Sequence, residues 1–133
     1  MSATHDLFLA AREAMAKCYA PYSKFPVGAA LRTTDGRVYS GANIEVASYP
    51  EGWCAETTML GHYIMGGGGE IAEIAVVAER MDRITPCGGC RQRLREFAAG
   101  DVPVWVADLD TVRARFTLGQ LLPASFGPAH LGP

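Results

Sequence analysis

Residues 71–97 read IAEIAVVAERMDRITPCGGCRQRLREF. The stretch opens with an apolar run of strand length, Ile71 to Ala78. Its centre, Pro86-Cys87-Gly88-Gly89-Cys90, is a turn that leads into a helix ending near Phe97. Another strand is predicted at Val102 to Ala107, soon after that helix. A Cys-x-x-Cys turn therefore stands between a strand and a helix of a layered α/β structure.

Outward from this stretch, helices and strands continue to alternate. An amphipathic helix is predicted from about Thr4 to Cys18, and a second helix from Cys54 to Met65. Asp35-Gly36 is a strong hairpin signal between two apolar runs. Further strands are expected at 27–33, 38–41 and 112–116, loops at 19–26 and 43–53, and a last helical turn at 118–122. This order predicts a single domain over residues 1–133, an α/β fold with helices on both faces of its sheet.

The composition indicates a packed globular protein rather than a disordered one. Apolar residues make up 49% of the 133 residues and charged residues 20%, and the formal net charge is −2. This charge balance gives no sign of the basic surface that binds a nucleic-acid backbone, so we expect no nucleic-acid partner. No apolar run is long enough to span a bilayer, and Met1–Ala10 lacks the pattern of a signal peptide. We therefore expect a cytoplasmic protein with no membrane partner, whose four cysteines serve metal binding or catalysis rather than disulfides.

Three of the cysteines have the spacing of a metal site. The two-residue spacer between Cys87 and Cys90 lets one turn present both sulfurs to one ion, and Cys54 can add a third sulfur. Both cysteine segments are predicted to begin helices, whose partial positive charge favours thiolates. Three thiolates leave one position of a zinc tetrahedron open, which is typical of a catalytic zinc rather than a structural one.

Glu56 follows Cys54 by two residues and is the candidate catalytic acid–base residue. On a helix the two side chains differ by about 200°, so Glu56 is badly placed to be a fourth ligand. Its carboxylate can instead reach water at the open metal position. A redox pair at Cys87 and Cys90, or a structural zinc with Cys18 as fourth ligand, would be the alternatives. Cys18 falls on the core face of the predicted first helix, where a small buried apolar role is expected.

Taken together, these motifs resemble the small, three-cysteine form of cytidine deaminase, a family in which this form is homotetrameric. The resemblance runs nearly from end to end of the chain. Its segments are YSKFPVGAA at 22–30, NIE at 43–45, ASYP at 47–50, CAE at 54–56, PCGGCRQ at 86–92, LLP at 121–123 and FG at 126–127. The resemblance implies a three-layer α/β/α sandwich with a mixed sheet of about five strands.

The resemblance also implies the reaction and its metal. The activity would be zinc-dependent hydrolysis of cytidine and deoxycytidine to uridine and deoxyuridine, with release of ammonia, in pyrimidine salvage. Cys54, Cys87 and Cys90 would hold one Zn²⁺ per chain, and Glu56 would move protons between water, the ring N3 and the leaving ammonia. A zinc deaminase of another substrate, such as blasticidin S, and a non-catalytic zinc module are the rival functions.

Substrate contacts follow from the same resemblance. Asn43 and Glu45 would hydrogen-bond the ribose 3′-hydroxyl, and Phe25 would pack near the base. Ala55 of the CAE motif is a further expected substrate-binding residue. An acid beside the sugar would repel a phosphate, which favours a free nucleoside as the small-molecule partner.

The remaining implied contacts cross between subunits of the expected homotetramer. Ala47 and Tyr49 would contact nucleoside bound in an adjacent subunit, and Phe126 would stack on a neighbour's base. The chain departs from the family at Thr57, where many members have an arginine that offsets thiolate charge. Arg91 and the two helix ends are the candidates for that compensation.

Overall fold

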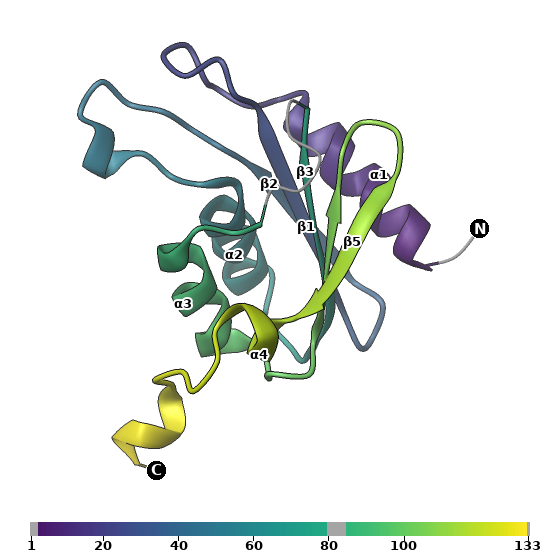
Figure 1. Cartoon of the computed structure of the whole chain (residues 1–133), viewed down its shortest axis with the longest axis vertical. Helices are drawn as coiled ribbons and strands as arrows, with labels where there is room; N and C mark the ends of the chain where they lie inside the picture. Colours follow the sequence, from purple (N-terminus) through teal and green to yellow (C-terminus); the bar gives the residue numbers. More distant parts are fainter. Residues whose placement is uncertain (1–2, 80–84, 133) are drawn as a thin grey trace.

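A five-stranded mixed sheet organises the residues that the computed structural model describes, 3–79 and 85–132 (Figure 1). Its strands are β1 (Val27–Thr33), β2 (Val38–Ala42), β3 (Ile71–Ala78), β4 (Pro103–Ala107) and β5 (Val112–Thr117). They lie in the order β2-β1-β3-β4-β5, in which β3 and β4 are parallel and the other neighbours are antiparallel. The predicted mixed sheet is confirmed.

Helices cover both faces of this sheet, as the sequence predicts. The helix α1 (Ala3–Met15) lies on one face, and α2 (Ala55–Met65) and α3 (Gly88–Phe97) lie on the other (Figure 1). The short α4 (Leu118–Leu121) follows β5 and packs beside α3. Two short 3₁₀ turns, Tyr49–Glu51 and Pro128–Leu131, complete the regular structure of the described residues. The fold is the α/β/α sandwich that the resemblance implies.

Each face of the sheet buries its own apolar core, because alternate residues of a strand point to opposite faces. The core under α1 comprises Leu7, Phe8, Ala11, Met15, Ala30, Ala75, Val77 and Ala107. The core under α2 and α3 includes Leu31, Met59, Leu60, Ile74, Val76, Leu94, Val104 and Leu118. The near-continuous apolar run of β3 follows from its central place, since it is covered on both faces.

Two glycines set the distance between the layers. A Cβ on Gly28 of β1 would lie 2.0 Å from the carbonyl oxygen of Ala11 in α1. A Cβ on Gly41 of β2 would lie 2.3 Å from the backbone nitrogen of Met59 in α2. Only glycine allows helix backbone to approach the sheet this closely, one on each face.

The first helix ends earlier than the sequence predicts, at Met15 rather than Cys18. The chain tightens there, because the N–H of Cys18 donates to the carbonyl of Met15 at 3.2 Å. The N–H of Tyr19 then donates to the carbonyl of Asn43 at 3.0 Å, and the N–H of Glu45 donates to the carbonyl of Tyr19. These bonds place the loop that follows α1 beside residues 43–45, which matters for the site.

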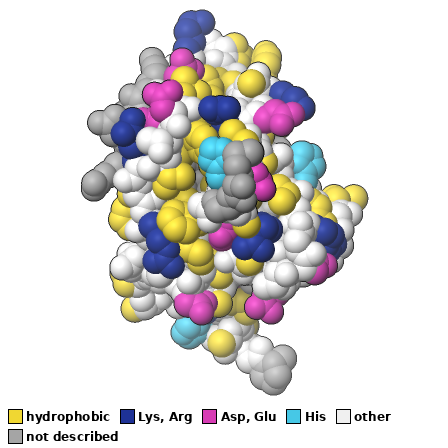
Figure 2. Space-filling model, turned by 90° about the vertical axis from the view of Figure 1, so that its right-hand side faces the viewer, with side chains coloured by type: hydrophobic (Ala, Val, Ile, Leu, Met, Phe, Trp, Pro, Cys, Tyr) yellow, Lys and Arg dark blue, Asp and Glu magenta, His cyan; other side chains and the backbone are white. Residues whose placement is uncertain are grey.

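The surface shows no separation of charge on the face drawn in Figure 2. Lys and Arg side chains are interspersed with Asp and Glu among the described residues of that face. Between residues 3 and 79 and between 85 and 132, no helix has the length and apolar character needed to cross a membrane.

Candidate active site

The three predicted cysteines meet at the N-terminal ends of two helices. Cys54 is the N-cap of α2, Cys87 is the N-cap of α3, and Cys90 lies in the first turn of α3. Their sulfur atoms all lie within 4.8 Å of one another, and the sulfurs of Cys54 and Cys87 are 3.9 Å apart. Zn–S bonds of about 2.3 Å in a tetrahedron place sulfurs about 3.8 Å apart. The donor set therefore fits zinc, with one coordination position left over.

The three thiols are electrostatically linked. Hydrogen bonds donated by Cys90 and by Cys87, aided by the charge of Arg93, lower the pKa of Cys54 to about 6 against the opposing effect of burial. The pKa of Cys90 is raised, because its proton is held in the bond to Cys54 and because it is buried. Metal binding requires thiolates, so uptake of zinc would release the Cys90 proton.

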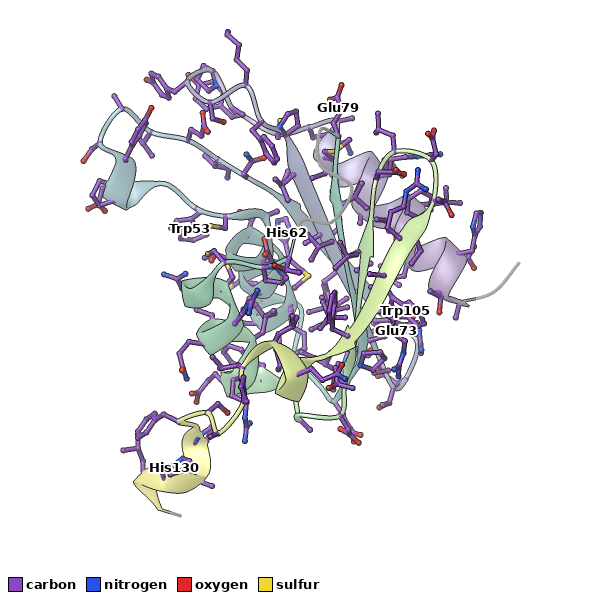
Figure 3. The ribbon with its side chains drawn as sticks, viewed as in Figure 1. Trp53, His62, Glu73, Glu79, Trp105 and His130 are labelled. Carbon is purple, nitrogen blue, oxygen red and sulfur yellow. The ribbon has the colours of Figure 1, made fainter. Side chains whose placement is uncertain are left out.

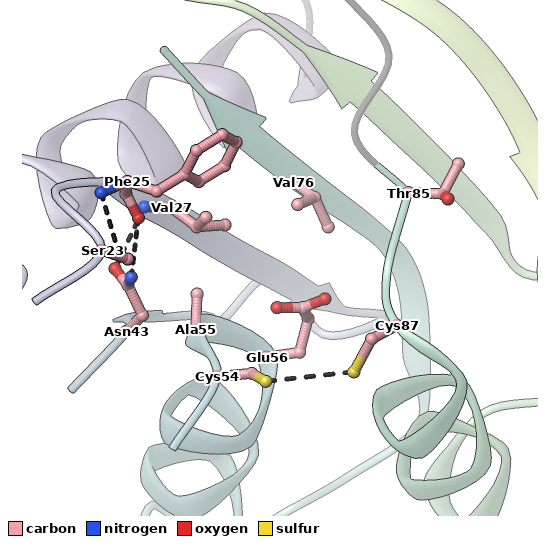
Figure 4. A pocket seen from close by; sticks show the side chains of 10 residues that line it. All are labelled: Ser23, Phe25, Val27, Asn43, Cys54, Ala55, Glu56, Val76, Thr85 and Cys87. Carbon is pink, nitrogen blue, oxygen red and sulfur yellow. Dashed lines mark hydrogen bonds between the residues drawn. The ribbon is translucent and has the colours of Figure 1, made fainter. Parts of the chain in front are cut away.

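Glu56 lies in the first turn of α2, beside the sulfurs. Its side chain is only 4% exposed, and Figure 4 shows the carboxylate next to Cys54 and Cys87. Burial raises the pKa of Glu56 to about 7, with a further increase from the nearby Cys54 and an opposing backbone hydrogen bond. A carboxyl group that titrates near neutrality can both take up and return a proton.

A cavity of about 330 Å³ opens over the sulfurs and Glu56 (Figure 4). Its wall is mostly apolar with a few polar groups, which is typical of small-ligand sites. The lining residues are Ser23, Phe25, Val27, Asn43, Cys54, Ala55, Glu56, Val76, Thr85 and Cys87. A second cavity of about 320 Å³ shares Ser23, Asn43 and Cys54 with the first and is also lined by Glu45 and Tyr49. The two cavities together form a site that extends from the sulfurs toward Glu45.

Asn43 and Glu45 brace the loop that forms one wall of this site. The side-chain amide of Asn43 accepts a hydrogen bond from the Val27 N–H at 3.0 Å and donates one to the Phe25 carbonyl at 2.9 Å. One carboxylate oxygen of Glu45 accepts the N–H groups of Tyr22 and Ser23, each at 3.0 Å. Hydrogen bonds from Ser23, and then from Tyr22, lower the pKa of Glu45. Both side chains are thus fixed, and each keeps capacity for a further partner.

The residues expected to act between subunits lie in exposed segments, and Tyr49 also lines the second cavity. Ala47 and Tyr49 belong to an exposed segment that projects from the sheet, with Tyr49 67% exposed (Figure 1). Phe126 is 56% exposed and stacks on His130, with ring centroids 5.2 Å apart, in the C-terminal segment that extends away from the sheet (Figure 3). By contrast, Phe25 and Ala55 line the first cavity, and their contact with the base stays a prediction.

The guanidinium of Arg91, one candidate for offsetting thiolate charge, makes three hydrogen bonds to oxygen atoms of other residues. The donors of its guanidinium bond the carbonyls of Pro86 and Leu121, both at 2.7 Å, and the Thr85 hydroxyl at 2.9 Å. Arg93, which the sequence reasoning missed, is the basic side chain that lowers the pKa of Cys54. The sequence feature that could have identified Arg93 is its position three residues after Cys90, on the same helix face.

Thr57, which directly follows the Cys54-Ala55-Glu56 motif, lies against the cysteine cluster. Its hydroxyl is 4.0 Å from the sulfur of Cys90. Cys18, the alternative fourth ligand, does not belong to the cysteine cluster found among residues 3–79 and 85–132. It is half-buried beyond the end of α1 rather than on the helix's core face.

Comparisons with known proteins agree with this geometry. Residues 1–106 match the family described as "Cytidine and deoxycytidylate deaminase zinc-binding region". A cytidine deaminase of Sporosarcina psychrophila is 39% identical over 94% of this chain and 92% of its own length. One from Halalkalibacterium halodurans is 44% identical over 81% of this chain and 82% of its own. The crystal structure of cytidine deaminase from Burkholderia pseudomallei superposes with a TM-score of 0.88, at 44% identity, covering 95% of this chain and all of that one.

Proposed function

The chain belongs to the cytidine deaminase family, and from this premise we propose that it hydrolyses cytidine and deoxycytidine to uridine and deoxyuridine with release of ammonia, in pyrimidine salvage. The observation that supports the proposal most is the buried carboxylate of Glu56 beside three sulfurs that lie within 4.8 Å of one another. A non-catalytic zinc module would have no use for this carboxylate or for the cavity over it. The direct test is the loss of absorbance when the protein is mixed with cytidine, with blasticidin S and deoxycytidine 5′-monophosphate as rival substrates.

The reaction needs a metal that the three cysteines are suited to hold. Zinc bound by these sulfurs would act as a Lewis acid and lower the pKa of a water molecule at its fourth position toward 7. The zinc would be held at the N-terminal ends of α2 and α3 by Cys54, Cys87 and Cys90. The partial positive charge of these helix ends would offset part of the thiolate charge.

Glu56 carries the proton transfers in this proposal. It takes a proton from water as the water oxygen bonds to C4 of the pyrimidine, and it delivers that proton to N3. A second proton then passes through Glu56 from the new C4 hydroxyl to the amino nitrogen. The C4–N bond breaks and ammonia leaves, so water and cytidine give uridine and ammonia. The buried position of Glu56 keeps its carboxylate close to these atoms and away from bulk water.

Asn43 and Glu45 select a substrate that carries a free sugar. An amide and a carboxylate suit a hydroxyl, which both donates and accepts hydrogen bonds. Both side chains are held in place by the loop they brace, so they would meet the ribose without further ordering. The charge of Glu45 disfavours a phosphorylated sugar.

Replacing Glu45 by glutamine tests this selection. The glutamine oxygen can still accept the N–H groups of Tyr22 and Ser23, while the charge-assisted bond to the sugar is lost. We expect kcat/KM for cytidine to fall about tenfold, since a hydrogen bond to a charged group contributes about 1.5–3 kcal/mol and the neutral bond that glutamine can still make about 0.5–1.5 kcal/mol. Steady-state kinetics on cytidine and on free cytosine check this, with Glu51→Gln, an exposed acid nearby, as the control. Equal kcat/KM for cytidine and cytosine in the unmodified protein would refute ribose recognition.

We further propose that the active form is a homotetramer. A groove of about 590 Å³ between α2 and α3 is lined by large apolar side chains that a single chain leaves partly exposed. Among them are Trp53, Ile64, Phe97 and Phe126. An exposed apolar surface of this kind usually marks contact with a partner. A second copy of the chain is the occupant we infer, because the same surface carries Phe126, which would reach a neighbour's base.

The Phe126→Ala variant is expected to raise KM for cytidine about tenfold while zinc content is unchanged. The reason is the loss of a ring stacked on the base, an interaction worth roughly 1–3 kcal/mol. Leu131→Ala, which removes an exposed apolar side chain from the same C-terminal segment, is the matched control and should leave KM unchanged. Sedimentation supplies the second measurement, because a fully active monomer at assay concentration would contradict both the assembly and the role of Phe126.

A further inference from the structure

The helix α3 has two attachments that are far apart in the sequence. Its first turn carries Cys87 and Cys90, and its side holds the C-terminal segment at residues 121–127. We propose that Arg91 is a positioning residue that fastens the turn preceding Cys87 to the end of α4 and thereby slows the loss of the metal. This inference rests on the proposed zinc site.

The side chain of Arg91 links α3 to two other segments, residues 85–86 and the end of α4. Its Nε donates to the carbonyl of Pro86, the residue directly before the ligand Cys87, at 2.7 Å. One terminal nitrogen donates to the hydroxyl of Thr85 at 2.9 Å, and the other donates to the carbonyl of Leu121 at 2.7 Å. Since Cys87 caps α3 without a side-chain cap bond, its position depends on the backbone that precedes it.

The far end of this link is firmly held. Leu121 is buried in the core under α2 and α3, and the adjoining Thr117 and Gln120 form a capping box that fixes the start of α4. Pro86 is fully buried as well. Arg91 therefore ties the approach to the metal turn to a rigid part of the fold rather than to a mobile surface.

Only a guanidinium can make this set of bonds. Its planar fork presents several donors in fixed directions, whereas a lysine ammonium is a single point on a flexible stem. A lysine at position 91 keeps the positive charge but cannot reach carbonyls of Pro86 and Leu121 and the hydroxyl of Thr85 together. The Arg91→Lys variant therefore loses the positioning bonds while it keeps the positive charge.

Arg95 provides a matched control one turn further along α3. Its Nε donates to the hydroxyl of Ser125 at 3.1 Å, and a terminal nitrogen donates to the carbonyl of Ala98 at 3.4 Å. Arg95 thus holds the same C-terminal segment as Arg91, through bonds that do not involve residues 85–87. An Arg95→Lys variant perturbs the segment without touching the metal turn.

The experiment measures how fast zinc passes from the loaded protein to a chromogenic chelator at neutral pH. Outer-shell changes typically cost about 10–100-fold in metal affinity, so we expect transfer from Arg91→Lys to be about 10–100-fold faster than from the unmodified chain. Arg95→Lys should stay within about twofold of the unmodified rate. Cobalt-loaded samples give a second readout, because the thiolate-to-cobalt charge-transfer band should change in Arg91→Lys and stay the same in Arg95→Lys.

Three results would overturn the inference. The first is an unchanged transfer rate in Arg91→Lys, and the second is an equal acceleration in both variants, which would indicate general loosening of the C-terminal segment. The third is an unmodified chain that binds no zinc, which rejects the proposed function together with this inference. If Arg91→Lys does not fold, Thr85→Val removes one of the three bonds and should speed transfer severalfold. An unchanged rate in Thr85→Val would then decide against the role.

Discussion

The Glu56→Gln variant is expected to keep its fold and its zinc while losing about 10²–10⁴-fold in kcat. Glutamine has the shape of the protonated carboxyl group but cannot take up or return a proton. Glu56 would serve every proton transfer of the reaction, and it is the one carboxylate among the described residues that line the first cavity. Because the change removes a buried charge rather than adding one, unfolding is not the expected cause of the loss.

The control for this variant is a second buried acid outside the site. Glu73 of β3 is also almost fully buried, bonds Thr4 of α1 and pairs with Arg32 at 3.5 Å. Glu73→Gln should leave kcat unchanged, whatever it does to stability. Steady-state kinetics and metal analysis on both variants check the expectation. A Glu56→Gln protein that turns over cytidine at a near-normal rate, with zinc confirmed, would contradict the proposed mechanism.

The fold could be predicted from the sequence where the pattern is local. The strand β3, Ile71–Ala78, has the predicted bounds, because its apolar run lies between two charged residues, Glu70 and Glu79. The helix α2 begins one residue after the predicted Cys54, and α3 begins at Gly88, inside the segment predicted as a turn, since both start directly after a cysteine cap. The end of α1 could not be predicted, because Ala16, Lys17 and Cys18 are compatible with a helix. A contact with Asn43, distant in sequence, decides where the helix ends.

In the site, too, the features that depend on local sequence could be predicted, and those that depend on distant contacts could not. The sulfur cluster follows from the spacing of Cys87 and Cys90 and from the motif at Cys54, and the structure brings all three together. The roles of Asn43, Glu45, Ala47, Tyr49 and Phe126 came from resemblance, and they stay predictions. The bonds of Arg91 to Leu121, and the influence of Arg93 on Cys54, depend on how α3 packs against distant segments. No local pattern predicts the bond from Arg91 to Leu121, and for Arg93 the only local sign is its position three residues after Cys90.

The Cys87→Ala variant is expected to lose nearly all bound zinc and all measurable turnover. Removing a ligand should cost more than the 10–100-fold in affinity that outer-shell changes cost. Cys87 is the best of the three positions for this test, because its side chain is exposed and its removal leaves no hole in a core. Cys90, by contrast, is buried, so alanine there would combine the loss of a ligand with a packing defect.

The fold of this variant should survive, since the Cys87 side chain makes no cap bond to α3 and the helix is held by Leu94 in the core. Circular dichroism would verify this, and metal analysis with a cytidine assay would measure the loss. Cys18→Ala is the control, because it removes a half-buried thiol outside the cluster and should leave zinc and turnover intact. Full zinc and activity in Cys87→Ala would exclude a three-sulfur site. Normal zinc with no activity would instead assign Cys87 to the reaction and require another ligand, which the cluster of Cys54, Cys87 and Cys90 does not offer.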